Sequence, residues 1–198
     1  MGVYGSPTYR RSLLLLALVL WAAAVNIDAQ QPFVHCSDVA FSIRIDHKRY
    51  KVGEQIVIRY TIKNVSNGAL FVPKSQWGIG CGDPPHFWAR LEDTSGKHYE
   101  YGYGGSCPVD RMSISEKMRK DALLLQPGQS ATGSFSFDSQ TFAKELNPGS
   151  YRLETVLYGW NLHFDDAQLS QLAAMGAPFL IGETHATIQV ELRDSSKT

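Results

Sequence analysis

One alternating stretch, residues 50–73, constrains the fold of this chain more than any other part of the sequence. From residue 54 onward, apolar side chains occupy every second position. One side of this alternation is formed by Ile56, Ile58, Tyr60 and Ile62. A period of two predicts a β-strand over residues 54–63 with one buried face and one wetter face.

The next residues predict a turn and a second strand. Residues 64–68 (NVSNG) are of the types that accept the dihedral angles of a reversal. Residues 69–72 resume an apolar run, and Pro73 ends it because proline has no amide hydrogen to pair. An amphipathic hairpin of this kind must cover its apolar face with a second sheet, so the sequence predicts a β-sandwich.

Further apolar or alternating runs raise the expected total to about nine short strands. These additional runs lie at residues 39–45, 87–92, 97–103, 123–125, 132–137, 151–157 and 184–193. Residues 126–129 (QPGQ) predict a type II turn. One or two short helices are expected in connections, at residues 139–146 and after Asp165, where Gln168 completes an approximate capping box, and a helical turn is expected at residues 115–120. Helices do not alternate with strands, so the expected class is all-β and antiparallel.

The first 29 residues have the pattern of a secretory signal peptide. Arg10 and Arg11 precede an apolar run at residues 13–25, and the small residue Ala29 follows. This run is too short for a comfortable membrane span, although an uncleaved anchor is the alternative. Export by the general pathway or by the twin-arginine pathway fits the arginine pair. We therefore expect residues 1–29 to be removed, and residues 30–198 to form one periplasmic or extracellular domain without a membrane span.

Charge narrows the range of partners. The chain has 19 basic and 19 acidic residues and a formal net charge of zero. It contains no run of Lys and Arg, whereas clustered positive charge supplies most of the affinity of nucleic-acid-binding proteins. The same argument disfavours a polybasic attachment to anionic lipid. An exported or envelope protein, or a glycan, is the expected partner, and nucleic acid is not.

Three segments also resemble a known type of domain. They are YKVGEQIVIRYTIKNVSNGALFVP in the central stretch, LQPGQS and LNPGSYRLETVLYGW. The chain is similar here to secreted bacterial immunoglobulin-like domains and resembles the Bacillus intracellular proteinase inhibitor family. The likeness covers residues 39–72 and 125–160, and it implies an immunoglobulin-like β-sandwich. No inhibitory residue is carried over from it.

The three cysteines are disulfide candidates in an exported chain. In an up-and-down strand order, successive connections alternate between the two ends of a sandwich. The loops that hold Cys81 and Cys107 are two connections apart, so they are expected to share an end. A bridge between them would contribute on the order of 3 kcal/mol. Pairing of Cys36 with either of the others is the alternative; otherwise Cys36 is free, buried or linked to another molecule.

The loop end that carries this predicted bridge is the candidate binding region. The residues singled out for binding are Trp77, Asp83, His86, Tyr101 and Tyr103. Trp and Tyr offer large, rigid contact surfaces, and the surrounding glycines let a partner approach the backbone. The competing interpretation is that some of these aromatic residues pack in the core or at its rim.

The sequence gives little indication of a metal site or of catalysis. Asp83 with His86, and His163 with Asp165 and Asp166, lack any recognised zinc spacing, and the Asp pair more simply caps a helix. We find no nucleophile elbow, zinc-protease helix, phosphate-binding loop or dinucleotide motif, so no cofactor and no enzymatic activity are expected. Asn64 also matches a glycosylation acceptor, but a turn explains that residue.

Three functional hypotheses follow. The first is an exported, non-catalytic binding domain that contacts an envelope protein or glycan through the stapled aromatic loops. The second is a secreted proteinase inhibitor, for which residues 108–120 offer Arg111 and Lys120 to a trypsin-like pocket. An inhibitory loop must be stiff, and this segment is polar and anchored only at Cys107. The third is a structural domain of an envelope assembly, with Cys36 linking chains.

Overall fold

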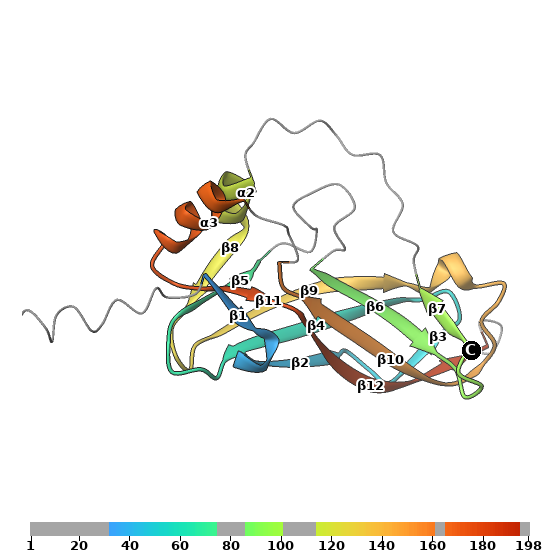
Figure 1. The fold of residues 1–198 in the computed structure, drawn as a ribbon. Coiled ribbons are helices and arrows are strands. Elements are labelled where there is room, and N and C mark those ends of the chain that lie inside the picture. Colours follow the sequence, from blue (N-terminus) through green and yellow to red (C-terminus); the bar gives the residue numbers. More distant parts are fainter. Residues whose placement is uncertain (1–31, 75–85, 101–113, 161–164, 195–198) are drawn as a thin grey trace, which may run out of the picture. The chain divides into compact units, whose positions relative to one another are not determined.

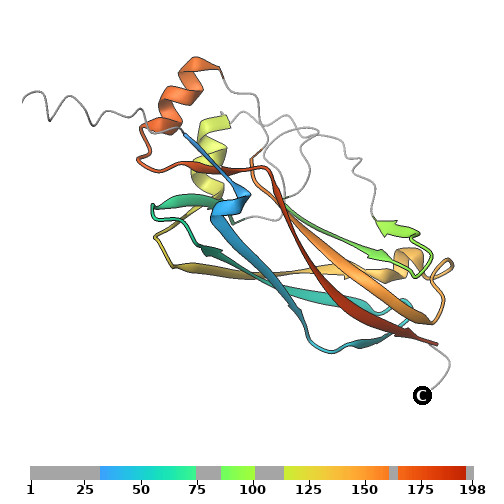
Figure 2. The same cartoon turned by 60° about the horizontal axis from the view of Figure 1, so that its bottom comes forward.

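The structure, a computed structural model, describes residues 32–74, 86–100, 114–160 and 165–194. Within these ranges the chain forms an all-β sandwich of twelve strands with two α-helices, and Figures 1 and 2 show its two layers. The expected signal peptide and its boundary at residue 29 lie outside the described residues. No helix in the described part of the chain is long and apolar enough to cross a membrane.

The strands form three sheets. The five-stranded sheet has the order β3 (Arg49–Lys51), β12 (Glu183–Arg193), β10 (Gly149–Tyr158), β6 (Phe87–Glu92) and β7 (His98–Glu100). The three-stranded sheet has the order β2 (Val39–Ile45), β4 (Gln55–Asn64) and β9 (Ser130–Asp138). The four-stranded sheet has the order β1 (Phe33–His35), β11 (Phe179–Ile181), β5 (Leu70–Pro73) and β8 (Ala122–Leu125).

Most strand pairs are antiparallel, as the sequence predicts. Three pairs are parallel: β1 with β11, β11 with β5, and β12 with β3. All three involve a strand of three or four residues. The strand count also exceeds the expected nine, because β1, β3 and β11 are too short to show a recognisable alternation.

The predicted hairpin of residues 54–63 and 69–72 is wrong. Strand β4 pairs with β2 and β9, whereas β5 pairs with β11 and β8. The chain leaves one sheet for another at Asn64, which is fully buried. The Asn64 amide donates to the carbonyls of Gly68 (2.7 Å) and Leu125 (3.0 Å), and its Oδ1 accepts from the backbone N–H of Ser66 (2.9 Å). These bonds fix a corner between two sheets rather than a two-strand reversal.

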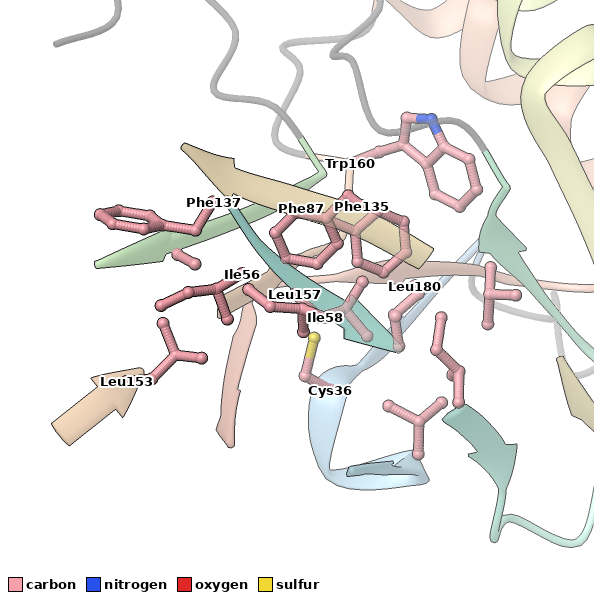
Figure 3. Packing of buried hydrophobic residues seen from close by; sticks show 14 of the residues in the cluster. Cys36, Ile56, Ile58, Phe87, Phe135, Phe137, Leu153, Leu157, Trp160 and Leu180 are labelled. Atoms are coloured by element: carbon pink, nitrogen blue, oxygen red, sulfur yellow. The ribbon is translucent and has the colours of Figure 1, made fainter. Parts of the chain in front are cut away.

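The predicted apolar faces are confirmed. Ile56, Ile58 and Ile62 are fully buried, and Tyr60 stacks on Phe87 of the opposite layer with ring centroids 4.1 Å apart. Figure 3 shows Phe87 of β6 and Phe135 of β9 meeting between the layers. Each buried side chain of this size contributes about 2 kcal/mol of hydrophobic stabilisation. The sandwich therefore closes through contacts between β4, β9 and β6.

Strand β10 is buried more completely than its alternation predicts. The expected inward set is buried throughout: Tyr151, Leu153, Thr155 and Leu157. Glu154 and Val156 on the other face are buried as well. After β10, Gly159 passes so close to β11 that a Cβ there would lie 2.4 Å from the Leu180 carbonyl oxygen. Glycine is required at this position because that contact is with backbone, which cannot rotate away.

The short helices follow the local sequence signals. Helix α2 (Ile114–Asp121) covers the predicted helical turn at residues 115–120. Helix α3 (Asp166–Ala173) begins at the predicted capping box, in which the Asp165 carboxylate accepts from the Gln168 N–H at 2.8 Å. The segment at 139–146 forms only a 3-10 turn, η2 (Ser139–Phe142), and Gly128 takes the positive φ of the predicted type II turn. A second 3-10 turn, η1 (Cys36–Asp38), precedes β2.

Candidate functional site

Of the residues predicted for binding and for the Cys81–Cys107 bridge, only His86 belongs to the described part of the chain. The remaining predicted residues lie outside the described ranges: Trp77, Cys81, Asp83, Tyr101, Tyr103 and Cys107. The predicted bridge and the aromatic loop end therefore stay predictions. Arg111 and His163, which were considered for inhibition and for metal binding, also lie outside these ranges.

His86 lies in the interior rather than at an exposed loop end, with 3% of its surface exposed. It immediately precedes β6, and its Nδ1 lies 3.0 Å from the Tyr158 carbonyl oxygen. A carbonyl can only accept, so Nδ1 carries the hydrogen. The ring also meets Trp160 edge-on, with centroids 5.4 Å apart. The sequence predicts His86 on a loop, whereas the backbone of β10 pairs with the chain there: the Tyr158 N–H donates to the His86 carbonyl at 2.8 Å.

The second ring nitrogen of His86 faces a carboxylate. Nε2 lies 3.5 Å from Oδ2 of Asp121, at the end of α2. Burial lowers the pKa of His86 to about 4, against the opposing effect of the Tyr158 carbonyl, so the ring is neutral at pH 7. Its Nε2 then offers only a lone pair toward Asp121, and it has no hydrogen-bond partner among the described residues. His86 is therefore an interior residue and offers no surface to a partner.

Cys36 is a free, buried thiol in η1. Burial raises its pKa to about 11, and Figure 3 shows its sulfur directed into the core cluster. A thiol with a raised pKa is a poor nucleophile, since the thiolate is the reactive form. Of the possibilities left open for Cys36, the structure therefore selects the free and buried one.

A different region gathers polar and aromatic side chains on the surface. It is the outer face of the five-stranded sheet, where alternate residues of β6, β10 and β12 point away from the core. We call it the ion-pair face and define it as Trp88, Arg90, Glu154, Tyr158, Glu183 and His185. The registers of β10 with β6 and with β12 bring these residues into adjacent rows.

Glu154 lies at the centre of the ion-pair face and is 7% exposed. Its two carboxylate oxygens accept from Arg90 Nε at 2.6 Å and pair with His185 Nδ1 at 2.9 Å. Burial by itself raises the pKa of Glu154, but the bonds from Arg90 and His185 outweigh it and hold the pKa below its ordinary value. The carboxylate is therefore ionised and fixed in orientation at neutral pH.

Two aromatic side chains extend the network at one end. Tyr158 lies opposite Glu183 in the register of β10 with β12, and burial is the main cause that raises its pKa. Glu183 in turn lies 3.3 Å from Nε2 of His185. The Arg90 guanidinium sits over the Trp88 ring, 5.5 Å from its centroid. Both aromatic residues are partly exposed, so the face combines a rigid charged centre with apolar contact area.

The ion-pair face was not predicted from the sequence. A signal was present, because residues 87–92 place Trp88, Arg90 and Glu92 at alternate positions, the polar side of a strand. The side chains that complete the network lie on β10 and β12, and the register between strands cannot be read from the sequence. Dispersed charges of this kind look like an ordinary solvated face until their pairing is known.

No group of three or more potential metal ligands exists among the described residues. Asp165, which was weighed as a ligand, caps α3 instead. The charged groups Arg90, Glu154 and His185 of the ion-pair face are paired with one another.

Comparison with known proteins gives no family assignment. No family model matches the sequence, and no curated protein matches it. Among solved structures, a β-glucosidase from Erythrobacter marinus is 8% identical with a TM-score of 0.39. The matched region is 78% of this chain and 15% of the glucosidase chain. A β-glucosidase from Listeria innocua is 14% identical with a TM-score of 0.37. The matched region is 78% of this chain and 16% of that glucosidase chain.

A smaller protein gives a similar result. The CARDB domain of a Pyrococcus furiosus protein is 12% identical with a TM-score of 0.33, and it covers 79% of this chain and 88% of its own. The chain thus spans about a sixth of the length of the two glucosidases. Likenesses at these scores carry no argument about activity, substrate or partner.

Proposed function

We propose that this chain is an exported, non-catalytic binding domain that contacts another exported or envelope protein through the ion-pair face. The observation that carries the proposal is the partly exposed pair Trp88 and Tyr158 on the same face as Arg90, which lies over the Trp88 ring and is held by Glu154. Trp, Tyr and Arg are the residues that contribute most to protein interfaces when truncated. Their fixed positions reduce the side-chain entropy that binding would otherwise cost.

A protein partner suits the face better than a glycan. Stacking of a sugar ring needs an open aromatic face, and the Arg90 guanidinium already lies over the Trp88 ring. A glycan therefore has to displace Arg90, which Glu154 holds at 2.6 Å. A protein instead packs around the existing arrangement and adds its own charges at the rim.

The inhibitor hypothesis is the alternative, and helix α2 weakens it. Lys120 lies inside α2 and is therefore helical. An inhibitory segment docks in an extended form, and residues 114–120 are helical instead. Residues 108–113 lie outside the described ranges, so Arg111 keeps its candidate role only as a proposal.

The test compares two outer faces of the same molecule. The purified chain and two variants, Trp88→Ala and Arg59→Ala, serve as bait for the exported proteins of the source organism. Arg59 is an exposed residue of β4 on the other outer face, so its variant controls for non-specific charge effects. We expect a protein to be retained by the parent chain and by Arg59→Ala, and its affinity to fall at least tenfold for Trp88→Ala.

Equal retention by all three chains would overturn the proposal. Retention of polysaccharide rather than protein would replace the protein partner with a glycan. Circular dichroism of each variant separates loss of binding from loss of folding. A retained protease should then be assayed for inhibition, because slowed proteolysis would revive the alternative.

A further inference from the structure

The corner that joins β4 to β5, residues 64–68, contains the one Asn-Gly pair of the chain, Asn67–Gly68. Both residues are exposed. Asparagine is among the chemically labile residues of proteins, since the backbone nitrogen of the following residue can attack its side-chain amide carbon. Glycine permits this attack best, because it has no Cβ to obstruct the ring that forms.

The structure leaves both reacting groups of this pair uncommitted. In the described part of the chain, neither the Asn67 side chain nor the Gly68 N–H takes part in a hydrogen bond. A Cβ built on Gly68 would meet no atom within 4 Å, so the space around this residue is open. The attack therefore needs no local unfolding of the chain.

Two other described asparagines each lack one of these conditions. Asn64 is fully buried, and its amide donates to two backbone carbonyls. Asn147 is exposed, but Pro148 follows it and has no N–H from which a nucleophile could form. Of the asparagines that the structure describes, Asn67 is thus the one that combines exposure, an uncommitted amide and a glycine neighbour.

We propose that Asn67 is a site of non-enzymatic deamidation, and that its isoaspartate product loosens the corner between β4 and β5. The Gly68 nitrogen bonds to Cγ of Asn67, and its proton passes through water to the side-chain nitrogen, which leaves as ammonia. Water then opens the five-membered succinimide at one of its two carbonyls. One opening gives aspartate and the other gives isoaspartate. No electrons are transferred, and water is the co-reactant.

Isoaspartate changes the corner because it routes the main chain through Cβ and Cγ, which adds one atom to the backbone. The Gly68 carbonyl accepts from the Asn64 amide at 2.7 Å and from the Ser66 hydroxyl at 2.9 Å. A displaced carbonyl leaves the buried amide short of an acceptor, and such a loss is destabilising. Aspartate adds a negative charge and no backbone atom. This inference does not depend on the ion-pair face, which lies on the five-stranded sheet.

Ageing of the purified chain in mildly alkaline buffer, which favours loss of the amide proton, tests the proposal. Trypsin cuts after Lys63 and Lys74, so one peptide, residues 64–74, carries both Asn64 and Asn67. Fragment-ion mass spectrometry should show a gain of one dalton at Asn67 that increases with time. At Asn64 the gain should not exceed that of an unaged sample digested in the same way.

Gly68→Ala is the matched control variant. Its methyl group enters open space, and Gly68 has no positive φ, so the variant should fold. The methyl group obstructs ring closure, and the rate at Asn67 should fall at least fivefold. An unchanged rate in Gly68→Ala would overturn the proposal, as would an equal gain at exposed Asn147. The same conclusion follows if the synthetic peptide 64–74 gains mass and the folded chain does not.

A second measurement separates the added charge from the longer backbone. Asn67→Asp adds only the charge, and it should leave the urea midpoint of unfolding unchanged because this side chain is exposed and unbonded. The isoaspartate form of the aged chain, separated by chromatography, should unfold at a lower urea concentration than Asn67→Asp. Equal midpoints would overturn the proposed loosening of the corner.

Discussion

Two histidine–carboxylate pairs in this molecule have the same chemistry and opposite surroundings. On the ion-pair face, His185 is half-exposed and lies 2.9 Å from Glu154. Inside the fold, His86 is buried and lies 3.5 Å from Asp121. The pKa of Glu154 is lowered because Arg90 and His185 both bond it, whereas the pKa of His86 is lowered because burial removes water from the ring.

The difference shows that partners, and not residue types, decide what a buried polar group contributes. Glu154 uses both carboxylate oxygens, so its burial is offset by charge-assisted hydrogen bonds. His86 uses only Nδ1, and its Nε2 faces another acceptor. We therefore expect Glu154 to stabilise the fold as an ion and His86 to stabilise it only while neutral.

The largest expected effect is the loss of stability in acid that His86 causes. Its pKa is lowered from 6.5 to about 4, so the unfolded chain binds this proton more readily than the folded chain. The contribution of His86 to the free energy of unfolding is complete above pH 6.5. It decreases by about 3 kcal/mol as the pH falls to 4. Urea unfolding at several pH values should show this component, and His86→Gln should lack it. His185→Gln is the control; if it removes as much of the pH dependence as His86→Gln, the assignment is wrong.

The next effect is that of removing the charge at Glu154. Glu154→Gln keeps the shape but leaves Arg90 and His185 without an anion, and we expect the free energy of unfolding to decrease by about 2 kcal/mol. Glu183→Gln removes an exposed carboxylate of the same face and should cost less than about 0.5 kcal/mol. Urea unfolding at pH 7 measures both. An equal decrease in the free energy of unfolding in the two variants would mean that the bonds of Glu154 to Arg90 and His185 do not stabilise the fold.

A smaller effect is expected from the pH range in which each pair loses its contribution to the free energy of unfolding. Because the folded pKa of Glu154 lies below its ordinary value of 4.5, its stabilisation is present above pH 4.5 and is lost as the pH falls through the folded value. The His86 component is lost between pH 6.5 and 4, before most of the Glu154 component. In Glu154→Gln, the decrease in the free energy of unfolding below pH 4.5 should be shallower than in the parent chain. An unchanged slope would show that Glu154 titrates alike in both states.

The smallest effect is expected at an exposed pair. Arg59 of β4 pairs with Asp46 across an open surface, where both side chains are more than a third exposed. Arg59→Ala should change the free energy of unfolding by less than about 0.5 kcal/mol, because water and salt screen such pairs. A loss above 1 kcal/mol would show that the three-stranded sheet depends on surface charge as the ion-pair face does.

Much of the fold could be predicted from short-range patterns. The faces of β4 and β10, the capping box at Asp165 and the turn at Gly128 depend on residues close in sequence, and each is confirmed. The partner of β5 could not be predicted, because Asn64 forms its corner partly with Leu125, which is 61 residues away. His86 was expected on a loop because the preceding glycines and prolines do not show that β10 pairs with it.

The candidate site shows the same limit more strongly. Trp88, Arg90 and Glu154 are unremarkable in the sequence, since each is one polar or aromatic residue in an alternating strand. Only the register of β6 and β12 on β10 brings Arg90 and His185 to the same carboxylate. The sequence alone determined that this chain forms strands with one apolar face each, because side-chain period and turn chemistry are local. The tertiary structure decided which strands are neighbours, and so which charges meet, because pairing depends on packing between residues far apart in the chain.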